Sequence, residues 1–295
     1  MISLYTLSLK LQAAASRDNK GEDLNRTFKP KQKVKKKLLV NSLQGKKIPN
    51  NAWNNFYQTH EEKFFKDRHY LLFEHTSLDE ALKTRKRIRL LDFGCGVGNA
   101  ILPLLETIKS ECRIEYLGLD VSPRAIQILT EKLKKFDSSC HLLMCKVLDL
   151  VNCAEEEWEQ VIEDFYTFSN CSDGFDFCLM IFTVSAFPPE KMAGSVKRAC
   201  DLLQKGSGRI CFRDYCDGDL AQKRFPIGQR ISRNLYVRQD GTLSFFFTKA
   251  GLIALFEEEM RLLWIRAVYR KVENRAYDLT MNRTWIGAEF IRKYN

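Results

Sequence analysis

The sequence lacks three features that would place it in a familiar class at once. No apolar run approaches the roughly 20 residues needed to cross a membrane, and no two cysteines have the Cys-x-x-Cys spacing of metal and redox motifs. Only four histidines occur in 295 residues, and they do not gather around the ten scattered cysteines. We therefore expect no membrane span and no bound metal, and the scattered cysteines fit a reducing compartment.

Acidic residues are missing from a stretch near the N-terminus. From Arg26 to Lys47 there are nine Lys or Arg residues and no Asp or Glu, and the whole chain has a formal net charge of +10. Residues 1–50 show little periodicity, which predicts a basic, flexible extension. It is either a solvated tail or nuclear-import signal, or an arm that lies along RNA phosphates. We expect a cytoplasmic protein, with the nucleus and the mitochondrion as alternatives.

Residues 51–295 are expected to form one domain, in which residues 51–75 are an N-terminal cap segment of one or two helices. After it, apolar strand patterns alternate with helical patterns, which predicts a doubly wound, mostly parallel α/β sheet. An Asp-Gly turn at 240–241 predicts a hairpin. Strands are expected at Ile88–Phe93, Ile114–Asp120, Leu142–Leu150, Phe175–Val184 and Arg209–Tyr215, with a terminal antiparallel pair at Leu262–Val272 and Arg283–Ile291.

A glycine turn follows the first of these strands. The segment LLDFGCGVGNA (Leu90–Ala100) has an acid, Asp92, and then three glycines spaced GxGxG. Dinucleotide sites use GxGxxG, because the third glycine serves the pyrophosphate. The second strand ends at Asp120, where a carboxylate can accept hydrogen bonds from both ribose hydroxyls. This order and spacing predict a site for S-adenosylmethionine, which has a ribose and an amino-acid end but no phosphates.

Short motifs recur along the chain over about Trp53–Tyr294. They are WNNFY (53–57), FFKDRHY (64–70), GCGVGN (94–99), DVSPRAI (120–126), FRDY (212–215) and YVRQDGT (236–242). Together they resemble one family, the tRNA N3-methylcytidine methyltransferases, for which FFKDRHY and YVRQDGT are more specific than the glycine loop. The resemblance implies a class I methyltransferase fold with a seven-stranded sheet and an N-terminal helical extension.

The resemblance implies transfer of a methyl group from S-adenosylmethionine to N3 of a cytidine in the anticodon loop of tRNA. It places the side chains of Trp53 and Tyr57 over the cofactor. Their i, i+4 spacing also suits two core residues on one face of a helix. Asp120 would bind the ribose, Asp149 and Leu150 would flank the adenine, and Ile181 would lie at the mouth of the methyl channel. The expected cofactor contacts are Trp53, Tyr57, Gly94, Gly96, Gly98, Asp120, Asp149, Leu150 and Ile181.

The chemistry of cytosine sets further requirements. N3 carries no proton at neutral pH, so its attack on a methyl group needs no general base, and the product ring is cationic. A carboxylate near the base could accept a hydrogen bond from its exocyclic amine and stabilise that cationic product, and Asp214 is the candidate. A base turned out of its stack also needs an aromatic platform and cationic contacts to phosphates. The candidate RNA contacts are Lys66, Arg68, Tyr70, Arg213, Tyr236 and Arg238.

Two other functions remain as alternatives. The first is a methyltransferase of the same fold that acts on a protein or a small molecule. The second is a non-catalytic RNA-binding protein on that fold, against which the intact glycine loop and Asp120 argue. For a tRNA methyltransferase, the partners would be tRNA and, as an open alternative, an aminoacyl-tRNA synthetase or another accessory protein.

Overall fold

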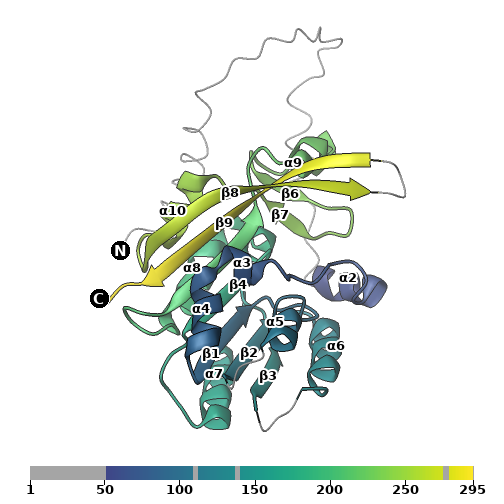
Figure 1. Cartoon of the computed structure of the whole chain (residues 1–295). Coiled ribbons are helices and arrows are strands. Elements are labelled where there is room, and N and C mark those ends of the chain that lie inside the picture. Colours follow the sequence, from purple (N-terminus) through teal and green to yellow (C-terminus); the bar gives the residue numbers. More distant parts are fainter. Residues whose placement is uncertain (1–50, 109–111, 137–139, 275–278, 295) are drawn as a thin grey trace, which may run out of the picture.

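The computed structural model describes residues 51–108, 112–136, 140–274 and 279–294; the predicted basic extension lies outside them. A seven-stranded sheet runs through the molecule in the order β3-β2-β1-β4-β5-β9-β8 (Figure 1). Strands β1 to β5 are parallel to one another, β9 is antiparallel to β5, and β8 is antiparallel to β9. The predicted mostly parallel sheet with a terminal antiparallel pair is therefore confirmed.

The strands of the large sheet are β1 (Arg87–Phe93), β2 (Arg113–Asp120), β3 (Leu142–Val147), β4 (Phe177–Ile181), β5 (Arg209–Tyr215), β8 (Met260–Asn274) and β9 (Leu279–Arg292). The predicted hairpin forms a separate small sheet of β6 (Leu235–Val237) and β7 (Leu243–Phe245). The helices are α2 (Ala52–His60), α3 (Leu71–Glu74), α4 (Thr76–Thr84), α5 (Ile101–Thr107), α6 (Pro123–Leu133), α7 (Glu155–Ser169), α8 (Pro189–Asp201), α9 (Leu220–Arg224) and α10 (Lys249–Phe256).

Two strands are shorter than the apolar pattern predicts. Strand β4 ends at Ile181 because Phe182 adopts a φ of 59°, and a 3₁₀ turn (Val184–Ala186) follows. Strand β3 ends at Val147, and two residues later Asp149 accepts hydrogen bonds from the backbone N–H groups of Val151 and Asn152. Both strands therefore end in turns that an apolar pattern does not reveal.

Two neighbouring residues fix the start of α6. The Ser122 hydroxyl accepts a hydrogen bond from the Ala125 N–H at 3.1 Å, and Pro123 occupies the first turn. A serine cap satisfies a helical N–H group that would otherwise lack a partner, and proline suits a position where no N–H is needed. The helix therefore begins directly after β2, where Asp120 lies.

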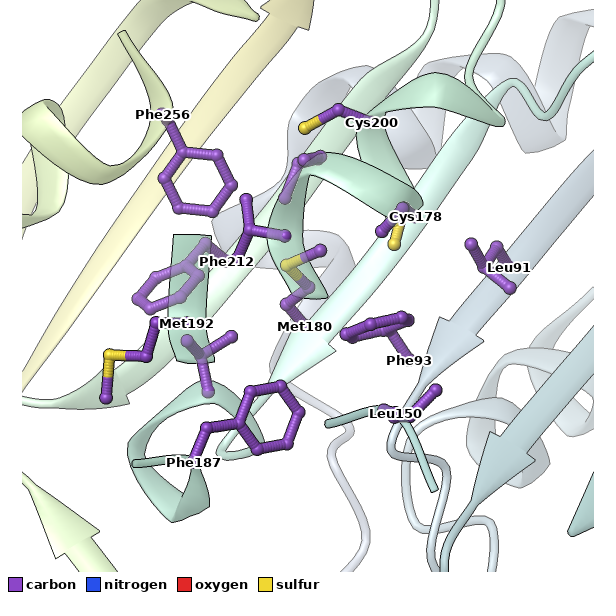
Figure 2. Packing of buried hydrophobic residues seen from close by; sticks show 14 of the residues in the cluster. Leu91, Phe93, Leu150, Cys178, Met180, Phe187, Met192, Cys200, Phe212 and Phe256 are labelled. Carbon is purple, nitrogen blue, oxygen red and sulfur yellow. The ribbon is translucent and has the colours of Figure 1, made fainter. Parts of the chain in front are cut away.

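Helices cover both faces of the sheet. On one face, α4, α5 and α6 pack against β1 and β2 through apolar side chains such as Leu78, Leu104 and Leu129. On the other face, the side chains of Phe93, Met180 and Phe212 come from three neighbouring strands. They form one apolar cluster with side chains of α8 and α10 (Figure 2). The apolar core thus has one layer on each face of the sheet. The helices that form these layers leave the carboxyl ends of the parallel strands accessible to a ligand.

A buried ion pair joins the cap segment to the sheet. Arg213 of β5 is 2% exposed and donates a hydrogen bond to the Glu74 carboxylate of α3, which is also buried. The guanidinium carbon lies 3.9 Å from the centre of the Tyr70 ring and 4.8 Å from that of Trp285. The two rings exclude water from the pair, so both charges depend on each other for stabilisation.

We expect Glu74→Ala to lower the free energy of unfolding by about 3–5 kcal/mol, because it leaves a buried guanidinium without a counter-charge. Urea denaturation of the purified protein measures the change. The matched control is Asp79→Ala on α4, whose partner Lys83 is 69% exposed, and which should cost at most about 1 kcal/mol. Equal losses in the two variants would contradict the importance of the buried pair.

Candidate functional site

A cavity lies at the carboxyl ends of the central strands. Strand β1 has β2 on one side and β4 on the other, so the chain order reverses there, as it does where doubly wound sheets bind ligands. Eight of the nine predicted cofactor residues line this cavity: Trp53, Tyr57, Gly94, Gly96, Asp120, Asp149, Leu150 and Ile181. The ninth, Gly98, lies outside it, where an added Cβ would be 2.4 Å from Leu129 of α6.

The glycine loop is held against the end of β2. The N–H groups of Gly94 and Cys95 both donate hydrogen bonds to the carbonyl oxygen of Leu119, at 2.8 and 3.0 Å. Gly96 has a φ of 53°, and a Cβ at this position would lie 2.5 Å from the Tyr57 hydroxyl. Glycine is therefore required at 96 both by the backbone conformation and by the close approach of the cap.

The carboxylate of Asp120 organises one wall of the cavity. It accepts hydrogen bonds from the backbone N–H groups of Gly96 and Ser122, each at 2.9 Å. Burial raises its pKa to about 6, although both N–H groups favour the charged form. Each carboxylate oxygen can accept a second hydrogen bond. The ionised side chain can therefore hold a ligand's hydroxyl groups while it holds the loop.

A second buried acid lies beside the glycine loop. Asp92 accepts a hydrogen bond from the Tyr116 hydroxyl at 3.1 Å, and burial raises its pKa to about 7. It lines the cavity, as does Asp149 after β3. Three carboxyl groups thus face the same cavity, which makes this side of it suited to hydroxyl and ammonium groups.

Helix α2 closes the cavity from the cap side. The side-chain oxygen of Asn54 accepts hydrogen bonds from the Ser122 hydroxyl and the Arg124 N–H, both at 3.1 Å. On the same helix, Tyr57 is buried, and the ring centre of Trp53 lies 6.2 Å from that of Tyr57. Both rings line the cavity, so α2 is fixed to the start of α6 and presents an aromatic surface.

The FFKDRHY segment is attached to the last residue of the glycine motif. The side-chain amide of Asn99 donates hydrogen bonds to the Asp67 carboxylate at 2.9 Å and to the carbonyl oxygen of Phe65 at 3.3 Å. The N–H of Arg68 donates in turn to the Asn99 carbonyl oxygen at 2.7 Å. The most specific motif of the sequence is thus held directly against the glycine loop.

A second wall of the cavity follows β4 and was not predicted from the sequence. Phe182, Thr183 and Ser185 follow β4 directly and line the cavity, as do Phe187 and Tyr215. The left-handed conformation of Phe182 is rare for an aromatic residue, and such strain persists mostly at functional sites. The only sequence signal was position, because these residues follow buried strands at the carboxyl edge of a parallel sheet.

Asp214 lies behind this wall and does not line the cavity. It is fully buried, and its carboxylate accepts hydrogen bonds from the Ser185 N–H at 2.9 Å and the Tyr215 N–H at 2.8 Å. Burial raises its pKa to about 7. The side chain is therefore placed to fix two cavity residues, rather than to contact a base itself as the sequence analysis expects.

The predicted RNA contacts do not form one surface. Arg68 and Arg238 line the cavity, and Lys66 is exposed outside it. Arg213 and Tyr236 are buried, at 2% and 7% exposure, because one is paired with a carboxylate and the other packs on a ring. These two side chains therefore support the fold around the cavity instead of facing solvent.

Their aromatic neighbours explain this burial. Tyr70 is half-buried over the Arg213 guanidinium. The rings of Tyr236 and Phe225 are stacked, with centres 4.7 Å apart. Arg213 thus packs against an aromatic ring, and Tyr236 packs against another.

The described ranges contain no group of three or more His, Cys, Asp or Glu side chains that could hold a metal ion. No helix in those ranges is long and apolar enough to cross a membrane. All ten cysteines lie within the described residues, and none of them forms a disulfide.

A family model described as a methyltransferase domain matches residues 59–259. With the sheet order and the glycine loop, this match defines the chain as a class I methyltransferase. Over 252 residues the chain is 36% identical to the tRNA N(3)-methylcytidine methyltransferase Mettl2 of Drosophila melanogaster, covering 81% of this chain and 70% of that protein. It is 34% identical to trm141 of Schizosaccharomyces pombe, covering 82% and 91%. The chain belongs to the tRNA N3-methylcytidine methyltransferase family.

Solved structures share the fold at low sequence identity. A SAM-dependent methyltransferase from Anabaena variabilis superposes with a TM-score of 0.55 at 17% identity, covering 83% of this chain and 95% of that one. The magnesium protoporphyrin IX methyltransferase of Synechocystis, solved with bound S-adenosylhomocysteine (SAH), has a TM-score of 0.50 at 11% identity. The match covers 83% of this chain and 98% of that one. These likenesses establish the sheet architecture and carry no information about the substrate.

We expect the affinity for S-adenosylmethionine to weaken roughly tenfold between pH 7 and pH 5, because protonation through a pKa of about 6 removes an acceptor at Asp120. The Asp120→Asn variant should bind more weakly at pH 7 and show a flatter profile. Isothermal titration calorimetry at several pH values measures both. A wild-type affinity that is constant down to pH 5 would exclude this role.

The Gly96→Ala substitution should weaken binding of the same cofactor by tenfold or more, because the new methyl group must displace the Tyr57 ring. Gly194→Ala in α8 is the matched control, since nothing lies within 4 Å of its Cβ position and alanine favours a helix by up to ~1 kcal/mol. The idea fails if both variants bind as the wild type does.

Proposed function

We propose that this protein transfers a methyl group from S-adenosylmethionine to N3 of a cytidine in the anticodon loop of tRNA. The observation that carries the proposal is the single cavity in which the glycine loop, Asp120 and the FFKDRHY segment meet. The relatives at 36% and 34% identity are both named tRNA N(3)-methylcytidine methyltransferases. Because the cavity joins the cofactor motif to the most specific family motif, both features support one site.

The cavity fits the parts of S-adenosylmethionine. The buried Asp120 can accept hydrogen bonds from both ribose hydroxyls, and Asp149 with Leu150 can flank the adenine. The glycine loop lets the backbone approach the methionine end, and the rings of Trp53 and Tyr57 cover the ligand. When bound, the cofactor supplies an electrophilic methyl group on a positively charged sulfur.

The protein's contribution to the reaction is alignment and exclusion of water. N3 of cytosine has a lone pair in the ring plane and no proton to lose, so no general base is required. In a paired stem N3 is already hydrogen-bonded, so the reactive cytidine must lie in a loop and leave its stack. Phe182, Phe187 and Tyr215 line the cavity with aromatic surface, against which a base can be held edge-on to the methyl group.

Asp214 acts as a positioning residue in this proposal. Its two hydrogen bonds fix the backbone of Ser185 and Tyr215, which line the cavity. Its negative charge also lies behind the wall that faces the product ring, which becomes cationic as the methyl group is transferred. The residue therefore supports the transition state through geometry and charge, without contact to the base.

We expect Asp214→Asn to lower the methylation rate up to roughly a hundredfold, because an amide cannot accept both N–H groups and the wall residues shift. The affinity for S-adenosylmethionine should stay within about threefold of the wild type, since Asp214 lies outside the cavity. Single-turnover rates and calorimetry separate the two effects. A normal rate would remove Asp214 from the mechanism.

The pH profile identifies the titrating group. Because burial raises the pKa of Asp214 to about 7, its carboxylate is lost as the pH falls through 7, and the rate should fall with it. His69 is exposed and does not line the cavity, so His69→Ala should keep the same profile. An acid limb that disappears in His69→Ala would make histidine the acid–base group.

RNA binding is proposed to extend beyond the cavity. Lys66 is exposed in the segment whose residues Phe65 and Arg68 line the cavity, and Arg238 lines the cavity at the end of the hairpin strand. The basic segment Arg26–Lys47 supplies nine further positive charges. Backbone phosphates attract such groups without regard to base identity, so we propose that these residues position tRNA while the cavity selects the base.

Deletion of residues 1–47 should weaken tRNA binding and flatten its dependence on salt. Each lost phosphate contact lowers the slope of log affinity against log salt by roughly 0.9 on a duplex. Filter binding at several salt concentrations measures the slope, and calorimetry with the cofactor is the control. An unchanged slope would show that the segment does not contact tRNA.

The proposal is tested with two RNA stem-loops of equal composition, one with the cytidine in the loop and one with it paired in the stem. Labelled methyl transfer, followed by nucleoside mass spectrometry, should yield 3-methylcytidine from the loop substrate alone. Transfer to total protein or to small molecules, with none to RNA, would favour the alternative methyltransferase functions. We further propose a cytoplasmic location, which the lack of disulfides among the ten cysteines of the described residues supports.

A further inference from the structure

We propose that Arg68 binds the α-carboxylate of S-adenosylmethionine, and is not a contact for an RNA phosphate. The inference rests on the proposed function only for the identity of the cofactor. It assigns to the FFKDRHY motif a role in cofactor recognition. Three features support this role: the charges in the cavity, the partners of its two cations and the attachment of Arg68 to the glycine loop.

The cavity has an uneven distribution of charge. Its acidic lining residues are Asp92, Asp120 and Asp149, and its basic ones are Arg68 and Arg238. The methionine end of S-adenosylmethionine carries an ammonium group and a carboxylate. The acids suit the ammonium group and the ribose, but the carboxylate requires a cation to offset their repulsion. One of the two arginines must therefore serve it, if the cavity holds this cofactor.

Arg238 is already occupied by protein acceptors. One terminal nitrogen donates to the Thr242 hydroxyl at 3.2 Å and to the Leu243 carbonyl oxygen at 3.4 Å. The other donates to the Tyr215 hydroxyl at 3.0 Å. These bonds hold the guanidinium on the hairpin side of the cavity, beside residues of the base-facing wall. Arg238 is thus the less suitable of the two for the methionine end.

The guanidinium of Arg68 has a different environment. Its guanidinium carbon lies over two aromatic rings, Phe182 at 5.0 Å and Phe65 at 5.8 Å, and within the described part of the chain its side chain forms no hydrogen bond or ion pair. Aromatic faces hold a guanidinium in place but do not neutralise its charge or accept its N–H bonds in the plane. The Arg68 guanidinium is half-buried and held in place, and its N–H donors are available to the two oxygens of a carboxylate.

The backbone places this cation at the glycine-loop end of the cavity. The N–H of Arg68 donates to the carbonyl oxygen of Asn99 at 2.7 Å, directly after the third glycine. Its positive charge also opposes the rise in the pKa of Tyr57, whose hydroxyl lies against Gly96. The methionine end is expected at this loop, because the ribose is assigned to Asp120. Arg68 therefore faces the cofactor's carboxylate, and its aromatic neighbours face the base.

The test is calorimetry without RNA, on the wild type and on Arg68→Gln, with two probes: S-adenosylmethionine and its decarboxylated form. We expect Arg68→Gln to bind S-adenosylmethionine roughly tenfold to a hundredfold more weakly, since a charge-assisted pair is lost. Binding of the decarboxylated probe should change less than about threefold, and Arg68→Lys should recover part of the loss, because a point charge remains.

The matched control is Lys63→Gln, which removes an exposed positive charge from the same cap segment outside the cavity. It should bind both probes as the wild type does, and thermal unfolding confirms that each variant is folded. Equal weakening of both probes by Arg68→Gln would overturn the proposal, because it would show a loss of cavity shape.

Unchanged cofactor binding by Arg68→Gln, with weaker binding of an anticodon stem-loop, would also overturn the proposal and assign Arg68 to an RNA phosphate. A wild-type protein that binds neither probe would contradict the proposed function itself, and with it this inference. The two failures are therefore distinguishable, because the first requires normal binding of S-adenosylmethionine by the wild type.

Discussion

The carboxylate of Asp120 joins the elements on which the site depends. It lies at the end of β2 and accepts N–H groups from the glycine loop after β1 and from the start of α6, each at 2.9 Å. Burial raises its pKa to about 6, so the loop and the helix are joined through a group that is ionised at neutral pH. The same charge is available to a ligand. The carboxylate of Asp120 thus fixes the geometry of the glycine turn and, in the proposed function, accepts the ribose hydroxyls.

The cap segment completes the site through contacts with the same elements. Asn54 of α2 bonds to residues at the start of α6, and Asn99 at the end of the glycine motif bonds to the segment that carries Arg68. Further along, Glu74 pairs with the buried Arg213 of β5. Attachment at three points fixes an aromatic cover over the cavity. The proposed cofactor and base sites are therefore walls of one cavity, so a shift in the cap would affect both.

Much of the fold follows from local patterns in the sequence. The Ser122–Pro123 cap, the glycine loop and the strand ending at Asp120 were predictable, because each signal and its structural effect lie within a few residues. The left-handed Phe182 was not, because its conformation is set by packing after β4. Asp214 and Arg213 were placed correctly on β5, yet their partners come from distant segments: Ser185 and Glu74. Sequence spacing identifies such charged residues, but only the tertiary arrangement shows whether they face a ligand or the protein interior.

The most direct measurement is the 3-methylcytidine content of purified tRNAs from cells that lack the protein, compared with cells that express it again as the wild type or as Asp120→Ala. Measured in cells, the result does not depend on whether an aminoacyl-tRNA synthetase or another accessory protein assists. The account predicts that at least one tRNA species loses the modification at an anticodon-loop cytidine, and that only the wild type restores it. An unchanged level in every tRNA, or full restoration by Asp120→Ala, would contradict it.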